Sequence, residues 1–212
     1  MPSTDPLFSH LTELQRDAFT ELVNIATGRV ALYLEALTNH PIHLTVPEVH
    51  LTQLDNLITK LEKKLNSPLA LVRQSIAGSI TGEVLFLLEF TNAANLNVIL
   101  TGHPPLQRER FDSSTRDVIT EVGNLLLTNC LSLLGEVLDI HVLFFPPRLR
   151  FIPYDASINT LQPKKINSDE HIYALITDIT FSQDQHVVSS QVVITLNESS
   201  LKTLFTAISK YE

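Results

Sequence analysis

The sequence has little cysteine, little glycine and no long hydrophobic run. Its one cysteine, Cys130, excludes an intramolecular disulfide framework and is typical of a reducing compartment. The six glycines are scattered, so no glycine-rich loop of the kind that cradles phosphate is present. No apolar run approaches the roughly 20 residues of a membrane span, and residues 1–7 lack the basic and apolar regions of a secretory signal. We therefore expect a cytoplasmic protein without membrane insertion.

The charge balance excludes a further class of partner. Fifteen basic and 23 acidic residues give a net charge of −8, whereas binding to a phosphate backbone needs a basic surface. Nucleic acid is therefore not an expected partner. A hydrophobic content of 44% with 18% charged residues is typical of an ordinary globular protein.

A short polar window occurs twice in the chain, one hundred residues apart. Residues 16–24 and 116–124 agree at five of nine positions, and all five are polar. Packing alone would favour the opposite result, because it constrains buried residues more than exposed ones. The repeated pattern is Asp, three residues, Glu, two residues, Asn, formed by Asp17, Glu21 and Asn24 and by Asp117, Glu121 and Asn124.

Hydrophobic periodicity predicts two halves with the same order of elements. Helices are predicted at 12–38, 52–65, 92–101, 112–138 and 198–210, and strands at 42–46, 69–77, 82–90, 140–145, 171–181 and 186–196. The stretch 148–169 stays open between a short helix and a loop. We predict an α/β duplication with pseudo-twofold symmetry, a single domain over 1–212 built from repeats at about 11–102 and 111–210.

The two long predicted helices carry the polar pattern on their outer sides. Thr12 and Gln15 have the spacing of a capping box, and Asp112 occupies the equivalent cap position. At about 100° per residue, the polar triplet lies almost opposite the apolar face. In the first helix that face is formed by Phe19, Leu22, Val23, Ala26, Val30, Tyr33, Leu34 and Leu37.

Exposed carboxylates on a helix are most often only solvated surface groups. Asn fits that interpretation less well, because it is a mediocre helix former at an exposed interior position. Its recurrence in register with the same carboxylates favours a functional strip. A convex helix face offers too few oxygens to complete the shell of a hard cation, so we predict no metal site on this chain.

Two prolines extend the pattern. Pro47 and Pro147 each follow the motif Asn after twenty-two intervening residues. With them, the chain resembles the CheC/CheX/FliY family of chemotaxis phosphatases, most closely its two-site CheC branch. The sequence departs from the glycine-rich run that often follows the first Asn of the family, since it has Ile25-Ala-Thr-Gly28 in one copy and Leu125-Leu-Leu-Thr128 in the other.

The resemblance implies an antiparallel sheet covered by two long active-site helices, and hydrolysis of the phosphoaspartate of a CheY-like response regulator. It implies that the Asn residues position water, that the Glu residues pair with a regulator lysine, and that the Asp residues serve docking. The implied catalytic residues are Glu21, Asn24, Glu121 and Asn124, and the implied docking residues are Asp17 and Asp117. The chain would need no cofactor, because the regulator would hold the required Mg²⁺.

Two other functions stay open. The chain could dock a response regulator, or the receptor deamidase CheD, without useful turnover. It could instead be a structural component of the flagellar switch.

Overall fold

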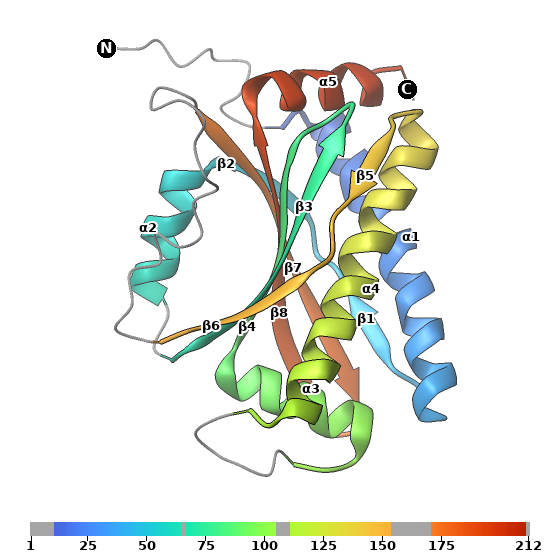
Figure 1. Cartoon of the computed structure of the whole chain (residues 1–212). Coiled ribbons are helices and arrows are strands. Elements are labelled where there is room, and N and C mark those ends of the chain that lie inside the picture. The colour runs from blue at the N-terminus through green and yellow to red at the C-terminus, as the bar shows by residue number, and fades with distance from the viewer. Residues whose placement is uncertain (1–10, 65–66, 105–110, 154–170, 211–212) are drawn as a thin grey trace.

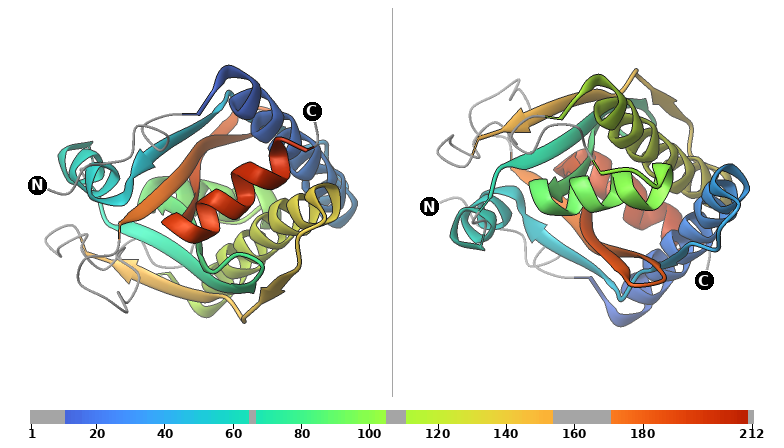
Figure 2. Two further views of the ribbon diagram at one scale, coloured as in Figure 1. Left: turned by 90° about the horizontal axis from the view of Figure 1, so that it is seen from above. Right: turned by 90° about the horizontal axis from the view of Figure 1, so that it is seen from below.

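The computed structural model describes residues 11–64, 67–104, 111–153 and 171–210, and the side chains of 62–64 are not described. A curled antiparallel sheet lies between two layers of helices (Figure 1). The described residues form five helices, namely α1 (Glu13–Thr38), α2 (Leu54–Lys64), α3 (Phe90–Thr101), α4 (Ser113–Leu138) and α5 (Glu198–Ile208). Helices α1 and α4 lie side by side on one face, α2 lies on the other, and α3 and α5 lie at opposite ends of the sheet (Figures 1 and 2).

Both long helices begin where the sequence places their caps. Thr12 accepts a hydrogen bond from the N–H of Gln15 and donates its own N–H to the Gln15 side chain, which completes the capping box. Asp112 accepts from the N–H of Thr115 at 2.8 Å. Such caps satisfy N–H groups that have no partner within the helix, and each stabilises the helix by about 1 kcal/mol.

The sheet contains eight strands, which are all paired antiparallel. They are β1 (His43–Thr45), β2 (Val49–Gln53), β3 (Leu69–Gly78), β4 (Gly82–Glu89), β5 (Val142–Phe144), β6 (Arg148–Ile152), β7 (Ile172–Gln183) and β8 (His186–Asn197). Their order is β1-β7-β8-β4-β3-β5, with β2 also paired to β7 and β6 to β3. The order has pseudo-twofold symmetry, since the short strands of each half pair with the long strand of the other half, and β4 and β8 meet at the centre.

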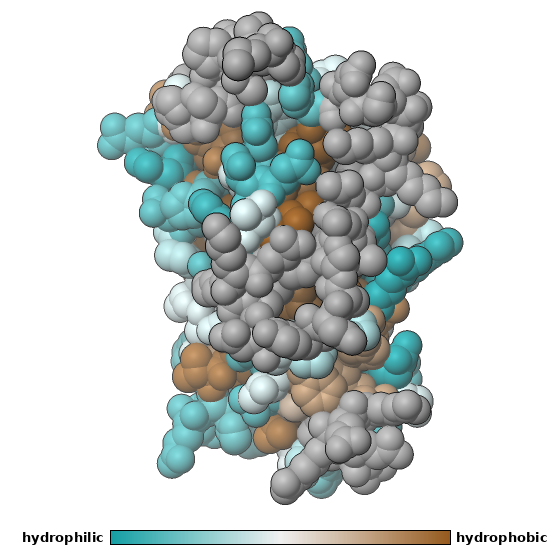
Figure 3. All heavy atoms as spheres, turned by 90° about the vertical axis from the view of Figure 1, so that its left-hand side faces the viewer, coloured by the Kyte–Doolittle hydropathy of each residue, from teal (hydrophilic) through white to brown (hydrophobic). Residues whose placement is uncertain are grey.

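The two faces of the sheet bury separate apolar clusters. Along β4, Val84, Phe86 and Leu88 pack towards α1 and α4, while Leu85 and Leu87 pack towards α2. A strand covered on both faces needs apolar residues at successive positions, which explains the uninterrupted run in this strand. The side of the molecule that carries α2 shows hydrophilic residues with smaller hydrophobic areas between them (Figure 3).

Helix α4 lies very close to the sheet at Gly123. A Cβ atom at this glycine would lie 2.8 Å from the Cβ of Val72 in β3, which is closer than real side chains approach. The equivalent position in α1 is Val23, which is buried. By length and composition alone α4 could also cross a membrane, but the core helix of a globular protein has the same features, and half of its apolar stretch is buried here.

Most predicted elements are present, but three predictions need correction. Strands β2 and β6 were not expected, because β2 lies partly in the stretch assigned to a helix and β6 in the stretch left open. Tyr33 and Leu37 were predicted to be buried, yet they are 47% and 58% exposed. Leu34, in the same turns of α1, is only 1% exposed, so the buried face of the helix is narrower here than its apolar stripe. Residues 154–169 of the open stretch lie outside the described residues.

Candidate functional site

The first motif copy faces solvent from the middle of α1. Asp17, Glu21 and Asn24 are exposed, whereas neighbouring residues on the opposite side of the helix, such as Phe19 and Leu22, are buried against the sheet. The sequence therefore predicted the direction of this strip correctly. The strip is available to a partner along its length.

The second copy has the same arrangement on α4, with one difference. Asp117 and Glu121 are exposed, but Asn124 is only partly exposed. The threonine one turn later, Thr128, donates its hydroxyl to Oδ1 of Asn124 at 3.4 Å. In the first copy, Thr27 donates instead to the backbone oxygen of Asn24 at 3.0 Å, which leaves the amide side chain of Asn24 unaffected.

The two copies do not form one combined site. Helices α1 and α4 run in opposite directions (Figure 1), and Nη1 of Arg29 lies 3.9 Å from Oε2 of Glu136 where they pack together. This contact sets the level of one helix against the other, and Asn24 and Asn124 lie on opposite sides of that level. At a rise of about 1.5 Å per residue, the two amides are on the order of 25 Å apart along the helix axes. The molecule therefore presents two separate surfaces, each with one amide and its carboxylates.

The proline of the first copy is held beside its helix by polar contacts. The N–H of Val49 donates to Oγ1 of Thr20 at 3.1 Å, and Nε of Arg16 lies 3.5 Å from Oε2 of Glu48. Thr20 lies one turn before Asn24, so these contacts place the segment around the exposed Pro47 next to the motif helix. The long spacing to the proline thus corresponds to a tertiary contact.

The second copy holds the corresponding segment differently. The guanidinium of Arg116 lies 4.9 Å from the centre of the Phe151 ring, a cation–π contact between α4 and β6. The hydroxyl of Thr120 returns to the backbone oxygen of Arg116 in its own helix. These supports were not predicted from the sequence. The signal was available, because Arg and Thr are both among the residues repeated between the two windows.

In the part of the chain that the structure describes, the groups with shifted pKa values do not form an alternative reactive centre. Burial raises the pKa of the Cys130 thiol to about 12, so the thiol is neutral and shielded. Burial also raises the pKa of the Glu83 carboxyl. The guanidinium of Arg73, whose Nη1 lies 3.3 Å from Oε2 of Glu83, partly opposes that shift. This pair connects β3 and β4 on the sheet face that α2 covers, away from both motifs.

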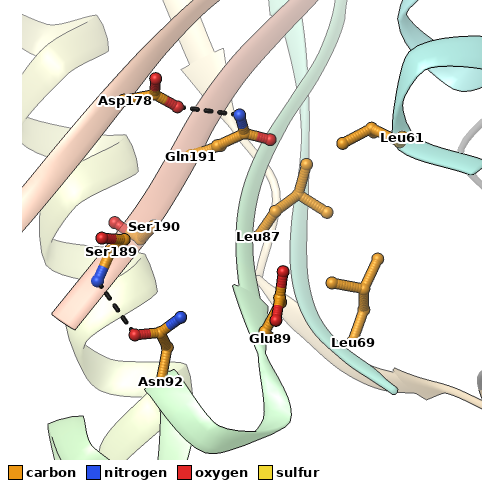
Figure 4. Close-up of a pocket in the computed structure, with 9 residues that line it drawn as sticks. All are labelled: Leu61, Leu69, Leu87, Glu89, Asn92, Asp178, Ser189, Ser190 and Gln191. Carbon is orange, nitrogen blue, oxygen red and sulfur yellow. Dashed lines mark hydrogen bonds between the residues drawn. The ribbon is translucent and has the colours of Figure 1, made fainter. Parts of the chain in front are cut away.

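A cavity on that same face is too small to suggest a substrate pocket. Its volume is about 100 Å³, below the several hundred Å³ of typical small-molecule sites. Three leucines and Glu89 line one side, and Asp178 and Gln191 lie on the other (Figure 4). Gln191 already donates to Asp178 at 2.8 Å. Within the described residues, no group of three or more His, Cys, Asp or Glu residues could hold a metal ion.

Comparisons with known proteins agree with the motif. No protein-family model matches the sequence. The chain is 24% identical over 204 residues to the CheY-P phosphatase CheC of Bacillus subtilis (strain 168), covering 95% of this chain and 97% of that protein. Its fold is similar to the crystal structure of Thermotoga maritima FliY, with a TM-score of 0.73, 18% identity, and coverage of 95% of this chain and 99% of that one. It is also similar to the FliM middle domain from H. pylori, with a TM-score of 0.65, 9% identity, and coverage of 93% and 99%.

These similarities first establish the fold of the chain. The curled antiparallel sheet with two long helices on one face is the CheC-like α/β fold. The similarity to CheC over nearly the whole chain then confirms the resemblance to the CheC/CheX/FliY family that the two motif copies indicate.

Proposed function

We propose that this chain is a phosphatase that hydrolyses the phosphoaspartate of a CheY-like response regulator. The observation that carries the proposal is the outward orientation of Glu21 with Asn24 on α1 and of Glu121 with Asn124 on α4. The similarity to a CheY-P phosphatase over 95% of the chain supports it. A cytoplasmic location fits such a substrate.

The chemistry needs little more than a correctly placed water. An acyl phosphate reacts through a loose transition state, so a catalyst acts mainly by holding the water in line with the leaving carboxylate. The water oxygen bonds to phosphorus, the acyl oxygen leaves as the carboxylate of the regulator, and inorganic phosphate is released. An Asn amide offers both a donor and an acceptor, so Asn24 and Asn124 can orient water without removing its proton.

The carboxylates guide docking in this proposal. Glu21 and Glu121 lie one turn before the amides and would pair with a lysine beside the phosphorylation site of the regulator. Asp17 and Asp117 extend the same exposed strips and contribute to docking. The Mg²⁺ that the reaction requires belongs to the acidic pocket of the regulator, so this chain supplies no metal ligand.

The test is the lifetime of the phosphate on a response regulator with and without the protein. Replacing both amides, Asn24→Ala with Asn124→Ala, should abolish the acceleration, while circular dichroism stays unchanged and the unfolding midpoint does not fall, because Ala is a better helix former than Asn. Asn56→Ala is the matched control, because Asn56 is an exposed helical asparagine outside both motifs. Wild-type turnover in the double variant would refute the role of the amides.

A non-catalytic docking function is the second candidate, favoured by the fold shared with the FliM middle domain. In that case the protein would bind a response regulator, a CheD-like deamidase or a flagellar switch component without shortening the phosphate lifetime. Binding measured together with lifetime separates the two functions. Tight binding with an unchanged lifetime supports docking alone.

A further inference from the structure

The two motif amides differ in how firmly they are held. Thr128 donates its hydroxyl to Oδ1 of Asn124, and Asn124 is only partly exposed. Asn24 is exposed, and no hydrogen bond to its side-chain amide is found among the described residues. Other helical threonines, such as Thr59 and Thr120, return their hydroxyls to backbone oxygens. Thr128 differs from these threonines, because its hydroxyl donates to a side-chain oxygen.

The first copy has no residue that could make the same contact. The position equivalent to Thr128 is Gly28, and an added Cβ there would meet nothing within 4 Å. Thr27 cannot substitute for it, because it is buried and bonded to the backbone oxygen of Asn24. The space needed for a hydroxyl is thus present in the first copy, but the hydroxyl is absent.

The contact has a consequence for catalysis. When Oδ1 is directed towards Thr128, Nδ2 lies on the other side of the amide and one amide orientation is favoured. Preorganising a group that positions a reactant lowers the entropy lost in the transition state. At 3.4 Å the contact is long for a bond between two oxygens, so it biases the orientation of the amide and a severalfold effect is expected.

We propose that Thr128 is a positioning residue that preorganises Asn124, and that Gly28 leaves Asn24 without this support. The two sites therefore turn over at different rates, with the second site the faster. This inference rests on the proposed function, because it concerns the rate at which each amide orients water. It adds a residue that the motif does not contain.

The kinetic test isolates one site at a time. In an Asn24→Ala background, Thr128→Val removes the hydroxyl at constant shape and should lower kcat about fivefold, the size of one hydrogen bond, with KM unchanged. Thr128→Ser should restore kcat. In an Asn124→Ala background, Gly28→Thr should raise kcat severalfold, whereas Gly28→Val should not. An unchanged kcat in Thr128→Val, or equal effects of Gly28→Thr and Gly28→Val, would overturn the proposal.

A second measurement does not depend on activity. The side-chain amide of Asn124, followed by nuclear magnetic resonance in the otherwise unaltered protein, should become more mobile in Thr128→Val while that of Asn24 stays the same. Equal mobility of the Asn124 amide before and after the change would refute the positioning role. If Thr128→Val mobilises the amide but the wild-type protein does not shorten the phosphate lifetime, the proposed function fails and the positioning contact stands.

Discussion

The two copies of the motif agree in their polar residues and differ in what surrounds them. The carboxylates and the amide occupy the same positions on α1 and α4, and both helices begin at a capping side chain. The supports have diverged: Thr20 and Arg16 hold the proline segment of the first copy, and Arg116 over Phe151 connects the second. The motif side chains and the contacts that support them are therefore provided by different residues, and substitutions can test the two sets separately.

The largest expected difference is between the two single amide variants. If the second site turns over about fivefold faster, Asn124→Ala should leave about a sixth of the phosphatase activity, whereas Asn24→Ala should leave about five sixths of it. The measurement is the initial rate of phosphate release at saturating phosphorylated regulator. Equal losses from the two variants would show that the copies are equivalent.

The next largest difference is expected in the free energy of unfolding when a glycine in each of the two long helices is replaced by alanine. Gly123→Ala should destabilise the protein by about 1–2 kcal/mol, because the new methyl group would collide with Val72 and its better helix propensity only partly compensates. Gly28→Ala should stabilise it by about 0.5–1 kcal/mol, because the position is helical and open. Urea unfolding measures both free energies. A destabilising Gly28→Ala would show that this surface is covered in solution.

A smaller difference is expected between the two arginines that support the sites. Arg16→Met removes a half-exposed ion pair with Glu48 and should cost less than about 1 kcal/mol, with the cost vanishing at high salt. Arg116→Met removes the contact with the Phe151 ring and should cost about 0.5–1 kcal/mol. Unfolding at low and at high salt separates them. The same salt dependence in both variants would contradict this distinction.

The smallest effect is expected at Cys130, whose equivalent in the first copy is the buried Val30. With its pKa raised to about 12 and its side chain covered, the thiol should not react with a disulfide reagent at pH 8 in the folded protein. It should react at once after unfolding in urea. Rapid labelling of the native protein would show that α4 separates from the sheet.

The sequence predicted the elements whose signal is local. The caps at Thr12 and Asp112 and the outward strips on both helices follow from helical spacing, and the structure has them. The prediction that one chain forms a single domain of two repeats stays a prediction. The roles of the motif residues likewise await the kinetic tests.

Features that depend on tertiary contact could not be read from the sequence. The short strands β2 and β6 exist because each pairs with a long strand of the other half, a partner that local periodicity does not reveal. The apolar residues Tyr33 and Leu37 follow the helical pattern but lie exposed beside the buried Leu34, because only part of the apolar stripe is covered there. The contact between Thr128 and Asn124 depends on the orientation of two side chains, which residue spacing alone does not fix.

The reciprocal pairing of the strands has a consequence for the integrity of the chain. Strands β1 and β2 are bonded to β7, and β5 and β6 to β3, so the hydrogen bonds of the sheet hold the halves together across its whole width. A cut between Gly102 and Phe111 would leave two fragments that complement each other and co-purify. Either fragment alone would expose long unpaired edges and would need a second copy of itself, or the missing fragment, to cover them.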